Sequence, residues 1–336
     1  MNGGMLYTKK EQILDISAKR PHIVILGAGA SRAACPLGDA NGNKLPLMID
    51  LVETLELEKK LDEANIYYDG INFEDIYSQI HANPKLIDLR HTIEDRVAEY
   101  FKGLLLPNEP TIYDYLVLSL RPKDGIATFN WDPFLWQALK RNREHAPIPK
   151  FFFLHGCAVL GHCEKDKTQG ELGRKCSMCN IMFKPTKLLY PIKDKNYISD
   201  SYIASQWQSL MAGLKGALLL TIFGYGAPNS DAAAIDLMSK AWGTPKERWL
   251  EQIEMIDKKS EKELNETWDR FIHTHHYHVS SDFFKSILAM HPRRSVEAHW
   301  QSSMMARFRE ENWVPRVKSL PELWEWFDTL IEVENK

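Results

Sequence analysis

The sequence contains no long apolar stretch. Its longest uncharged segment, residues 216–230, is interrupted by Gly224 and Gly226, whereas a membrane-spanning helix needs about 20 apolar residues. The charged residues 9–11 near the start are followed by no apolar run, so the sequence also predicts no secretory signal. We therefore expect a cytoplasmic protein that makes no membrane contact.

The chain also lacks an excess of charge of either sign. Its 42 Lys and Arg residues stand against 45 Asp and Glu residues, which gives a formal net charge of −3. No positive field is therefore available to hold nucleic acid directly or an anionic membrane. Of the 336 residues, 44% are hydrophobic and 26% are charged. These values are typical of globular proteins, so a substantial core is expected.

Cysteine is scarce as well. The sequence has five cysteines, an odd number, and four of them lie close together in the chain, which favours a local thiol or metal site over a disulfide framework. Cys176 and Cys179 have the C-x2-C spacing that forms half of a structural zinc site. The other half is irregular, because Cys157 and Cys163 are six residues apart and His162 lies between them. A zinc ion held by four cysteines, one held by three cysteines and His162, a cluster of reduced thiols, and a degenerate zinc ribbon all remain open.

Four short apolar runs, each followed at once by small or polar residues, organise the chain. Continuous apolar runs of this length are typical of strands buried on both faces of a parallel sheet. The runs are residues 23–26 before Gly27, 126–129 before Asn130, 151–154 before His155, and 217–223 before Gly224. The sequence thus predicts an α/β fold with a Rossmann-like parallel sheet, in a single domain that spans residues 1–336.

The rest of the chain is predicted to be mainly helical. Residues 40–120 carry apolar side chains at helical spacing and are interpreted as a helical insertion. Residues 156–185 form a small cysteine-containing loop module that could hold zinc, and residues 258–336 are expected to be mostly helical.

Two polar groups in the last region could suggest a ligand site. We interpret Arg293 and Arg294 as a solvated turn after Pro292, with phosphate contact as the alternative. The histidines at positions 273, 275, 276 and 278 are interpreted as a polar surface or interface, because alternation along a strand would divide them between two faces.

The polar residues that follow the four apolar runs are candidates for one binding site, because ligands of parallel α/β sheets bind at the carboxyl ends of the strands. Residues 27–31 allow a phosphate to approach the backbone closely. Arg32 occupies the place of the third glycine in a dehydrogenase fingerprint, which argues against hydride transfer. Taken singly, the glycines could form only a tight turn, Asn130 and Asp132 could only cap helices, and His155 could be a core histidine.

Taken together and in order, these segments resemble the sirtuin family. The matching segments are GAGAS at 27–31, TFNWD at 128–132, LHG at 154–156, a cysteine loop, and FGYG at 223–226. The resemblance implies that NAD binds here. The cofactor-binding set that follows from it consists of Gly27, Ala28, Gly29 and Ser31 along the pyrophosphate, together with Gly224, Tyr225 and Asp231.

The resemblance also implies a catalytic set. Asn130 matches the asparagine at the nicotinamide ribose, Asp132 the aspartate near the carboxamide, and His155 the general base. A histidine with the ordinary pKa of about 6.5 is largely neutral at pH 7 and can accept a proton. Nicotinamide would leave from an oxocarbenium-like state without help from a metal. Zinc held by Cys157, Cys163, Cys176 and Cys179 would therefore be structural.

The chain departs from sirtuin deacylases at two segments. Residues 32–39 replace the GIPDFR motif, and residues 189–195 replace the FGE segment that helps to clamp an acyl-lysine peptide. With these departures the pattern resembles bacterial sirtuin-like proteins of antiphage defence. We expect an NAD glycohydrolase that depletes NAD and is controlled by homo-oligomerisation, a regulatory partner or an infection signal. The alternatives are an NAD-dependent protein deacylase and a non-catalytic subunit that binds NAD or ADP-ribose.

Overall fold

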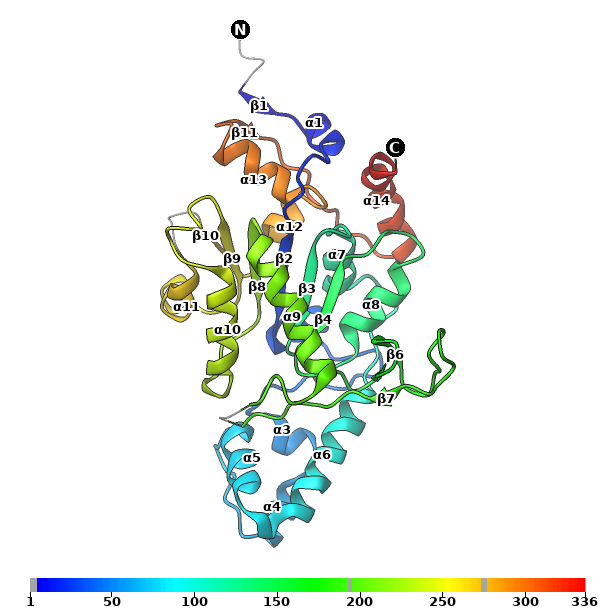
Figure 1. Cartoon of the computed structure of the whole chain (residues 1–336), viewed down its shortest axis with the longest axis vertical. Helices are drawn as coiled ribbons and strands as arrows, with labels where there is room; N and C mark the ends of the chain where they lie inside the picture. Colours follow the sequence, from blue (N-terminus) through cyan, green and yellow to red (C-terminus); the bar gives the residue numbers. More distant parts are fainter. Residues whose placement is uncertain (1–4, 193–194, 273–276, 336) are drawn as a thin grey trace.

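The computed structural model describes residues 5–192, 195–272 and 277–335. Among these residues, the main element is a six-stranded sheet in the order β10-β9-β8-β2-β3-β4, with every neighbouring pair parallel (Figure 1). Its strands are β2 (His22–Leu26), β3 (Gly125–Thr128), β4 (Lys150–Phe153), β8 (Leu219–Phe223), β9 (Gln252–Ile256) and β10 (Tyr277–Ser280). The predicted α/β fold with a parallel sheet is confirmed. The histidines at 273, 275 and 276 lie outside the described residues.

Both faces of this sheet are buried. In β2 every residue is buried, and the side chains of Ile23 and Ile25 enter one core cluster while those of Val24 and Leu26 enter the other. This division follows from the alternation of side chains along a strand. One face is covered by α2 (Ala28–Ala34), α7 (Ile112–Leu118) and α8 (Phe134–Asn142), and the other by α9 (Ser201–Gly216), α10 (Ala232–Trp242) and α11 (Glu261–Trp268).

The predicted helical insertion is confirmed between β2 and β3. It contains α3 (Leu51–Thr54), α4 (Glu58–Glu63), α5 (Phe73–Ala82) and α6 (Ile87–Lys102) ahead of α7. These four helices form a separate group below the sheet in Figure 1. On α6, Ile93, Val97 and Phe101 lie on one face and are buried. Helix α6 packs against α5, so the helical spacing of apolar residues in the sequence reflects the burial of one face of the helix.

Two strands of the sheet, β9 and β10, were not predicted. Strand β9 has no continuous apolar run because Glu254 stands at its centre, yet this side chain is buried. Its carboxylate accepts hydrogen bonds from Thr221 Oγ1 (2.9 Å) and the Ile287 amide (2.7 Å). Burial raises its pKa to about 7. Strand β10 is a short edge strand within residues 258–336, so that region is less purely helical than expected.

The interpretation of Arg293 and Arg294 as a solvated turn was wrong, and so was phosphate contact. Both side chains are buried, and both pair with the Glu334 carboxylate at 2.5 Å. Arg293 also donates to the carbonyl oxygens of Leu118 and Leu120 at 3.0 Å. The two guanidinium groups therefore fasten the last helix, α14 (Leu320–Glu334), to the main body of the protein.

The first and last helices of the described chain, α1 (Lys9–Leu14) and α14, pack against each other in the upper part of Figure 1. Here β1 (Leu6–Tyr7) pairs with β11 (Phe308–Arg309), beside α1, α12 (Ile287–Met290) and α13 (Ser295–Ser303). Short 3-10 turns cover Pro84–Leu86, Asn229–Asp231, Asp269–Phe271 and Phe283–Lys285.

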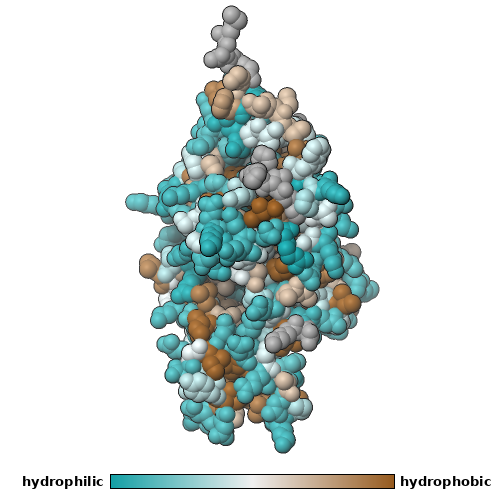
Figure 2. Space-filling view, turned by 90° about the vertical axis from the view of Figure 1, so that its left-hand side faces the viewer, coloured by the Kyte–Doolittle hydropathy of each residue, from teal (hydrophilic) through white to brown (hydrophobic). Residues whose placement is uncertain are grey.

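The cysteine module forms a small antiparallel sheet of its own, made of β5 (Leu160–Cys163), β6 (Thr168–Glu171) and β7 (Lys184–Pro185). Within the described parts of the chain, no helix has the length and apolar character needed to cross a bilayer. Hydrophilic side chains predominate on the face shown in Figure 2, and the hydrophobic ones form scattered groups.

Candidate functional site

Two glycine loops cross in direct backbone contact at the carboxyl ends of β2 and β8. The Gly27 amide donates to the Phe223 carbonyl (3.0 Å), and the Gly29 amide donates to the Gly224 carbonyl (2.9 Å). A Cβ atom on Gly27 would lie 2.5 Å from the Gly224 oxygen, and one on Gly224 would lie 2.3 Å from the Ala30 nitrogen. Gly224 also has a φ of +60°. Glycine is thus required on both loops.

A cavity of about 590 Å³ opens at this crossing. All ten residues predicted as catalytic or cofactor-binding line it, and residues of the helical insertion such as Met48, Leu51 and Phe101 form another part of its wall. The predicted residues are Gly27, Ala28, Gly29, Ser31, Asn130, Asp132, His155, Gly224, Tyr225 and Asp231. The volume lies in the range of small-molecule and cofactor sites.

Asn130 is the centre of a buried hydrogen-bond network at the end of β3. Its amide nitrogen Nδ2 donates to the Gly27 carbonyl and to Ser31 Oγ, both at 2.9 Å, and lies 3.4 Å from the Tyr113 hydroxyl. The Gly27 carbonyl can only accept, so the orientation of the amide group is fixed. The amide oxygen Oδ1 accepts no hydrogen bond from the described residues, so it is the atom available to a ligand.

Asp132 joins the same network from the start of α8. Its Oδ2 accepts from Ser31 Oγ (2.7 Å), and its Oδ1 accepts from the Phe134 amide (3.1 Å). Burial raises the pKa of this carboxyl to about 6, although these two hydrogen bonds lower it. Asp132 thus binds the first amide of α8, but the N-cap position is Pro133, so the alternative that made Asp132 the helix cap was wrong. Asp132 also lines the cavity.

His155 is buried at the cavity and lies beside a second buried ionisable side chain, Asp231. Its Nε2 atom has no hydrogen-bond partner among the described residues and lies 3.7 Å from Asp231 Oδ1. Burial lowers the pKa of His155 to about 3; the Asp231 carboxylate raises it and the Lys195 ammonium lowers it. The imidazole is therefore neutral at pH 7. Its ring is held edge-on against Phe129 at 4.8 Å, and Phe129 stacks on Tyr225 at 4.1 Å.

Asp231 is the negatively charged side chain next to His155. The Lys195 ammonium donates to Oδ1, and the Tyr225 hydroxyl donates to Oδ2 at 2.8 Å. Burial raises the pKa of the carboxyl, but His155 and Lys195 outweigh burial, so the pKa lies below its ordinary value. Asp231 is thus an anion paired with a buried lysine, and the His155 imidazole lies beside it without a hydrogen bond to it.

The cysteines lie apart from the cavity. Cys163, Cys176 and Cys179 gather with Asp166, and their ligand atoms all lie within 4.8 Å of one another. Cys157 does not join this group, because its thiol points to the Asp132 carbonyl at 3.6 Å. His162 lies outside the group as well, with its ring stacked on Tyr202 at 5.2 Å.

The chain was compared with known proteins. No protein-family profile matches it, and no curated protein matches it. Its shape is similar to that of a Sir2 homologue in complex with NAD, at 13% identity and a TM-score of 0.43, over 87% of this chain and 94% of that one. A mutant Sir2 homologue in complex with ADP-ribose matches at 12% identity and a TM-score of 0.39, over 89% of this chain and 99% of that one. At such low values, the likeness assigns no activity to this chain.

Several cavity residues were missed by sequence reasoning. Glu74 comes from the insertion, and its carboxylate accepts from the Ser230 amide at 3.0 Å. Tyr113, on α7, does not line the cavity, but its hydroxyl joins the network around Asn130. Lys195 lies in the segment noted above only as a departure from sirtuin deacylases. Asp257 directly follows β9, so it would have been found had that strand been predicted.

Proposed function

We propose that this protein is a sirtuin-like NAD glycohydrolase that cleaves NAD to nicotinamide and ADP-ribose. The observation that carries the proposal is the convergence of four separate strand ends on one cavity. Parallel strands end at one edge of a sheet in any protein, but here the polar side chains that follow the strands also line one shared cavity. The motif resemblance then indicates which ligand such a cavity would accept.

The glycine crossing suits the pyrophosphate of NAD. Gly27, Gly29 and Gly224 carry no side chain, and Cβ atoms there would collide with the neighbouring backbone. The amides of these glycines already donate to the carbonyls of Phe223, Gly224 and Ile256. What the glycines would offer is close approach of the pyrophosphate to a backbone without side chains. The apolar part of the wall, which includes Leu51 and Phe101, suits the uncharged adenine ring of the dinucleotide.

The polar groups suit cleavage of the bond between ribose and nicotinamide. The leaving group is already cationic in NAD, so the protein needs mainly to orient the ribose and to stabilise an oxocarbenium-like state. Asn130 Oδ1 would accept a hydrogen bond from a ribose hydroxyl, and Asp132 would hold the nicotinamide carboxamide. Neutral His155 would accept a proton from water or a ribose hydroxyl, and the nearby Asp231 carboxylate would stabilise the imidazolium that forms.

The biological role proposed here rests on the motif pattern. The chain lacks the GIPDFR and FGE segments of sirtuin deacylases, and we propose that it acts in antiphage defence by depleting cellular NAD. An unrestrained NAD hydrolase would harm its own cell, so control by homo-oligomerisation or by a regulatory partner is part of the proposal.

The test is incubation of the purified full chain with NAD, with nicotinamide and ADP-ribose followed by chromatography. Asn130→Ala and His155→Ala should each abolish release of nicotinamide. His145→Ala is the matched control, because His145 is exposed and stacks on Trp324 away from the cavity. Activity that persists in both cavity variants would refute the site. Release of nicotinamide that requires an acetyl-lysine peptide would identify a deacylase, and NAD binding without turnover would identify a binding subunit.

A further inference from the structure

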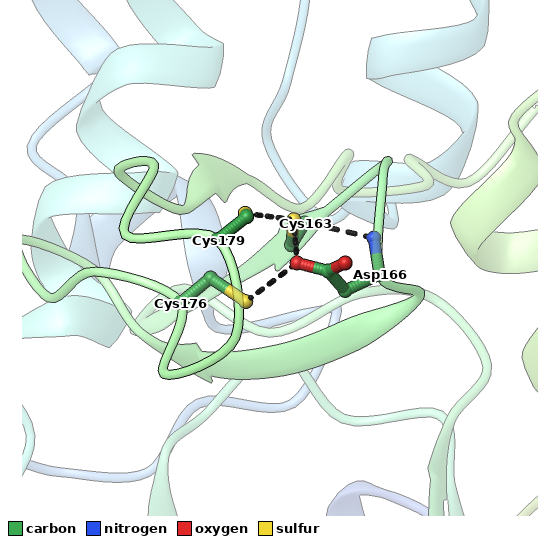
Figure 3. Close-up of side chains that lie close together, drawn as sticks. All are labelled: Cys163, Asp166, Cys176 and Cys179. Atoms are coloured by element: carbon green, nitrogen blue, oxygen red, sulfur yellow. Dashed lines mark hydrogen bonds between the residues drawn. The ribbon is translucent and has the colours of Figure 1, made fainter.

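A group of metal-ligand side chains lies outside the cavity, at the end of the small sheet β5-β6-β7. The thiols of Cys163, Cys176 and Cys179 and the carboxylate of Asp166 point toward one another (Figure 3). We propose that these four side chains hold one Zn²⁺ ion, and that Asp166 rather than a fourth cysteine completes the ligand set. The proposal is independent of the reaction carried out in the cavity.

The distances fit tetrahedral coordination. With zinc bonds of about 2.3 Å to sulfur and about 2.0 Å to oxygen, two sulfur ligands lie about 3.8 Å apart, and a sulfur and an oxygen lie about 3.5 Å apart. Cys163 Sγ lies 3.5 Å from Cys179 Sγ. Asp166 Oδ2 lies 3.6 Å from Cys163 Sγ and 3.2 Å from Cys176 Sγ. Each distance agrees within a few tenths of an ångström.

The spacing along the chain is also that of a zinc site. Cys163 and Asp166 are three residues apart, as are Cys176 and Cys179, so the pattern is C-x2-D followed by C-x2-C. Each pair closes a tight turn. In the first, the Asp166 amide donates to Cys163 Sγ at 3.5 Å, and in the second the Asn180 amide donates to the Cys176 carbonyl at 2.9 Å. The zinc ligands predicted from the sequence were only Cys and His, so the first turn was not predicted as half of the site.

Cys157 cannot be the fourth ligand without a rearrangement of the core. It is 1% exposed and lies before β5, whereas the cluster lies beyond the far end of that strand. Its backbone amide donates to Thr186 Oγ1 (3.2 Å), and its carbonyl accepts from the same hydroxyl (3.0 Å). His162 is adjacent to Cys163 on β5, so its side chain points to the opposite face of the small sheet.

The composition of the module explains why an ion is needed there. Beside the cluster, Met178, Ile181 and Met182 are exposed rather than packed into a core. A small module that buries so little apolar surface has few other means to hold its loops. Metal binding supplies this folding free energy directly.

The experiment uses the full chain with its metal removed and then supplied as Zn²⁺ or as Co²⁺, whose absorption reports thiolate ligands. One ion per chain is expected from elemental analysis. Asp166→Ala should weaken Zn²⁺ affinity by at least about 10- to 100-fold, since loss of a second-sphere partner alone has that effect. Asp166→Cys should restore binding and raise the intensity of the thiolate-to-cobalt band by about one third, because three thiolates become four.

Two further variants serve as controls. Cys157→Ala should bind one ion with an unchanged cobalt spectrum. Glu164→Ala removes an exposed carboxylate next to the cluster that pairs with Lys184 at 3.1 Å, and it should keep full affinity. The proposal is overturned if Asp166→Ala binds as tightly as the natural chain, if Cys157→Ala loses the ion, or if neither the natural chain nor Asp166→Cys holds one.

Discussion

His155 Nε2 lies 3.7 Å from Asp231 Oδ1, and no hydrogen bond joins the two buried groups. The same carboxylate oxygen accepts from the Lys195 ammonium instead. In this arrangement Asp231 is fully paired and His155 is neutral. Any event that draws Lys195 away from Asp231 would leave the carboxylate to His155 and make the imidazole a stronger base.

This relationship predicts opposite effects of two substitutions on the pKa of His155. Lys195→Met removes a neighbouring positive charge and should raise that pKa from about 3 by about one unit or more. Asp231→Asn removes the negative charge that raises it and should lower it further. NMR titration of the imidazole measures both, with the exposed Lys140→Met as control. A shift in the same direction in both variants would contradict the assignment.

The glycine crossing predicts a large difference between two neighbouring glycines. Gly224→Ala places a Cβ atom 2.3 Å from the Ala30 nitrogen at a φ of +60°, and should lower the free energy of unfolding by about 1–3 kcal/mol or more. Gly226→Ala is the matched control, because the nearest atom to its Cβ is Lys259 Nζ at 3.8 Å. Urea denaturation measures both. Equal stability of the two variants would mean that the loops do not cross as described.

The raised pKa of buried Asp132 predicts that the folded protein loses stability as the pH rises. Its pKa is about 6 in the folded protein and about 3.8 when exposed, so between these values the folded state keeps a proton that the unfolded state has released. Raising the pH through this window should therefore cost about 3 kcal/mol of unfolding free energy. Asp132→Asn should lack this component. Denaturation of both chains from pH 4 to pH 7 tests it, and parallel pH profiles would contradict it.

The ion pairs of Glu334 with Arg293 and Arg294 predict that attachment of α14 to the rest of the protein depends on this one carboxylate. Glu334→Gln leaves Arg293 and Arg294 buried without a counter-charge, and should lower the free energy of unfolding by about 3–5 kcal/mol. Glu332→Gln changes an exposed residue of the same helix and should have little effect. Thermal unfolding of the two variants compares them directly, and similar melting temperatures would argue against the pairing.

The sequence was informative wherever a local pattern matched a local environment. The runs before Gly27, Asn130, His155 and Gly224 are apolar because both faces of their strands are buried, so the strands could be predicted. Since parallel strands end at one edge of a sheet, the polar residues that follow could be predicted to lie near one another.

Prediction failed in two situations. In one, a buried polar residue interrupted the apolar pattern of a strand. In the other, the ion-pair partner of a buried charge lay far away in the chain. Glu254 made β9 unrecognisable as an apolar run, although its buried carboxyl group accepts hydrogen bonds from Thr221 and the Ile287 amide. Arg293 and Arg294 looked solvated because their partner, Glu334, is about forty residues away in the chain.

By itself, the sequence determined four of the six strands, β2, β3, β4 and β8, together with the helical insertion and the glycine loops. These features depend on side-chain periodicity and on backbone freedom that neighbouring residues fix. Only the tertiary structure decided that Lys195 forms an ion pair with Asp231 and that Tyr113 contacts Asn130 and Ser31. It also decided that Asp166, rather than Cys157, lies with the other three thiols. In each of these contacts a buried polar or charged side chain finds its hydrogen-bond or ion-pair partner in a distant part of the chain. Such partners come together only once the chain has packed.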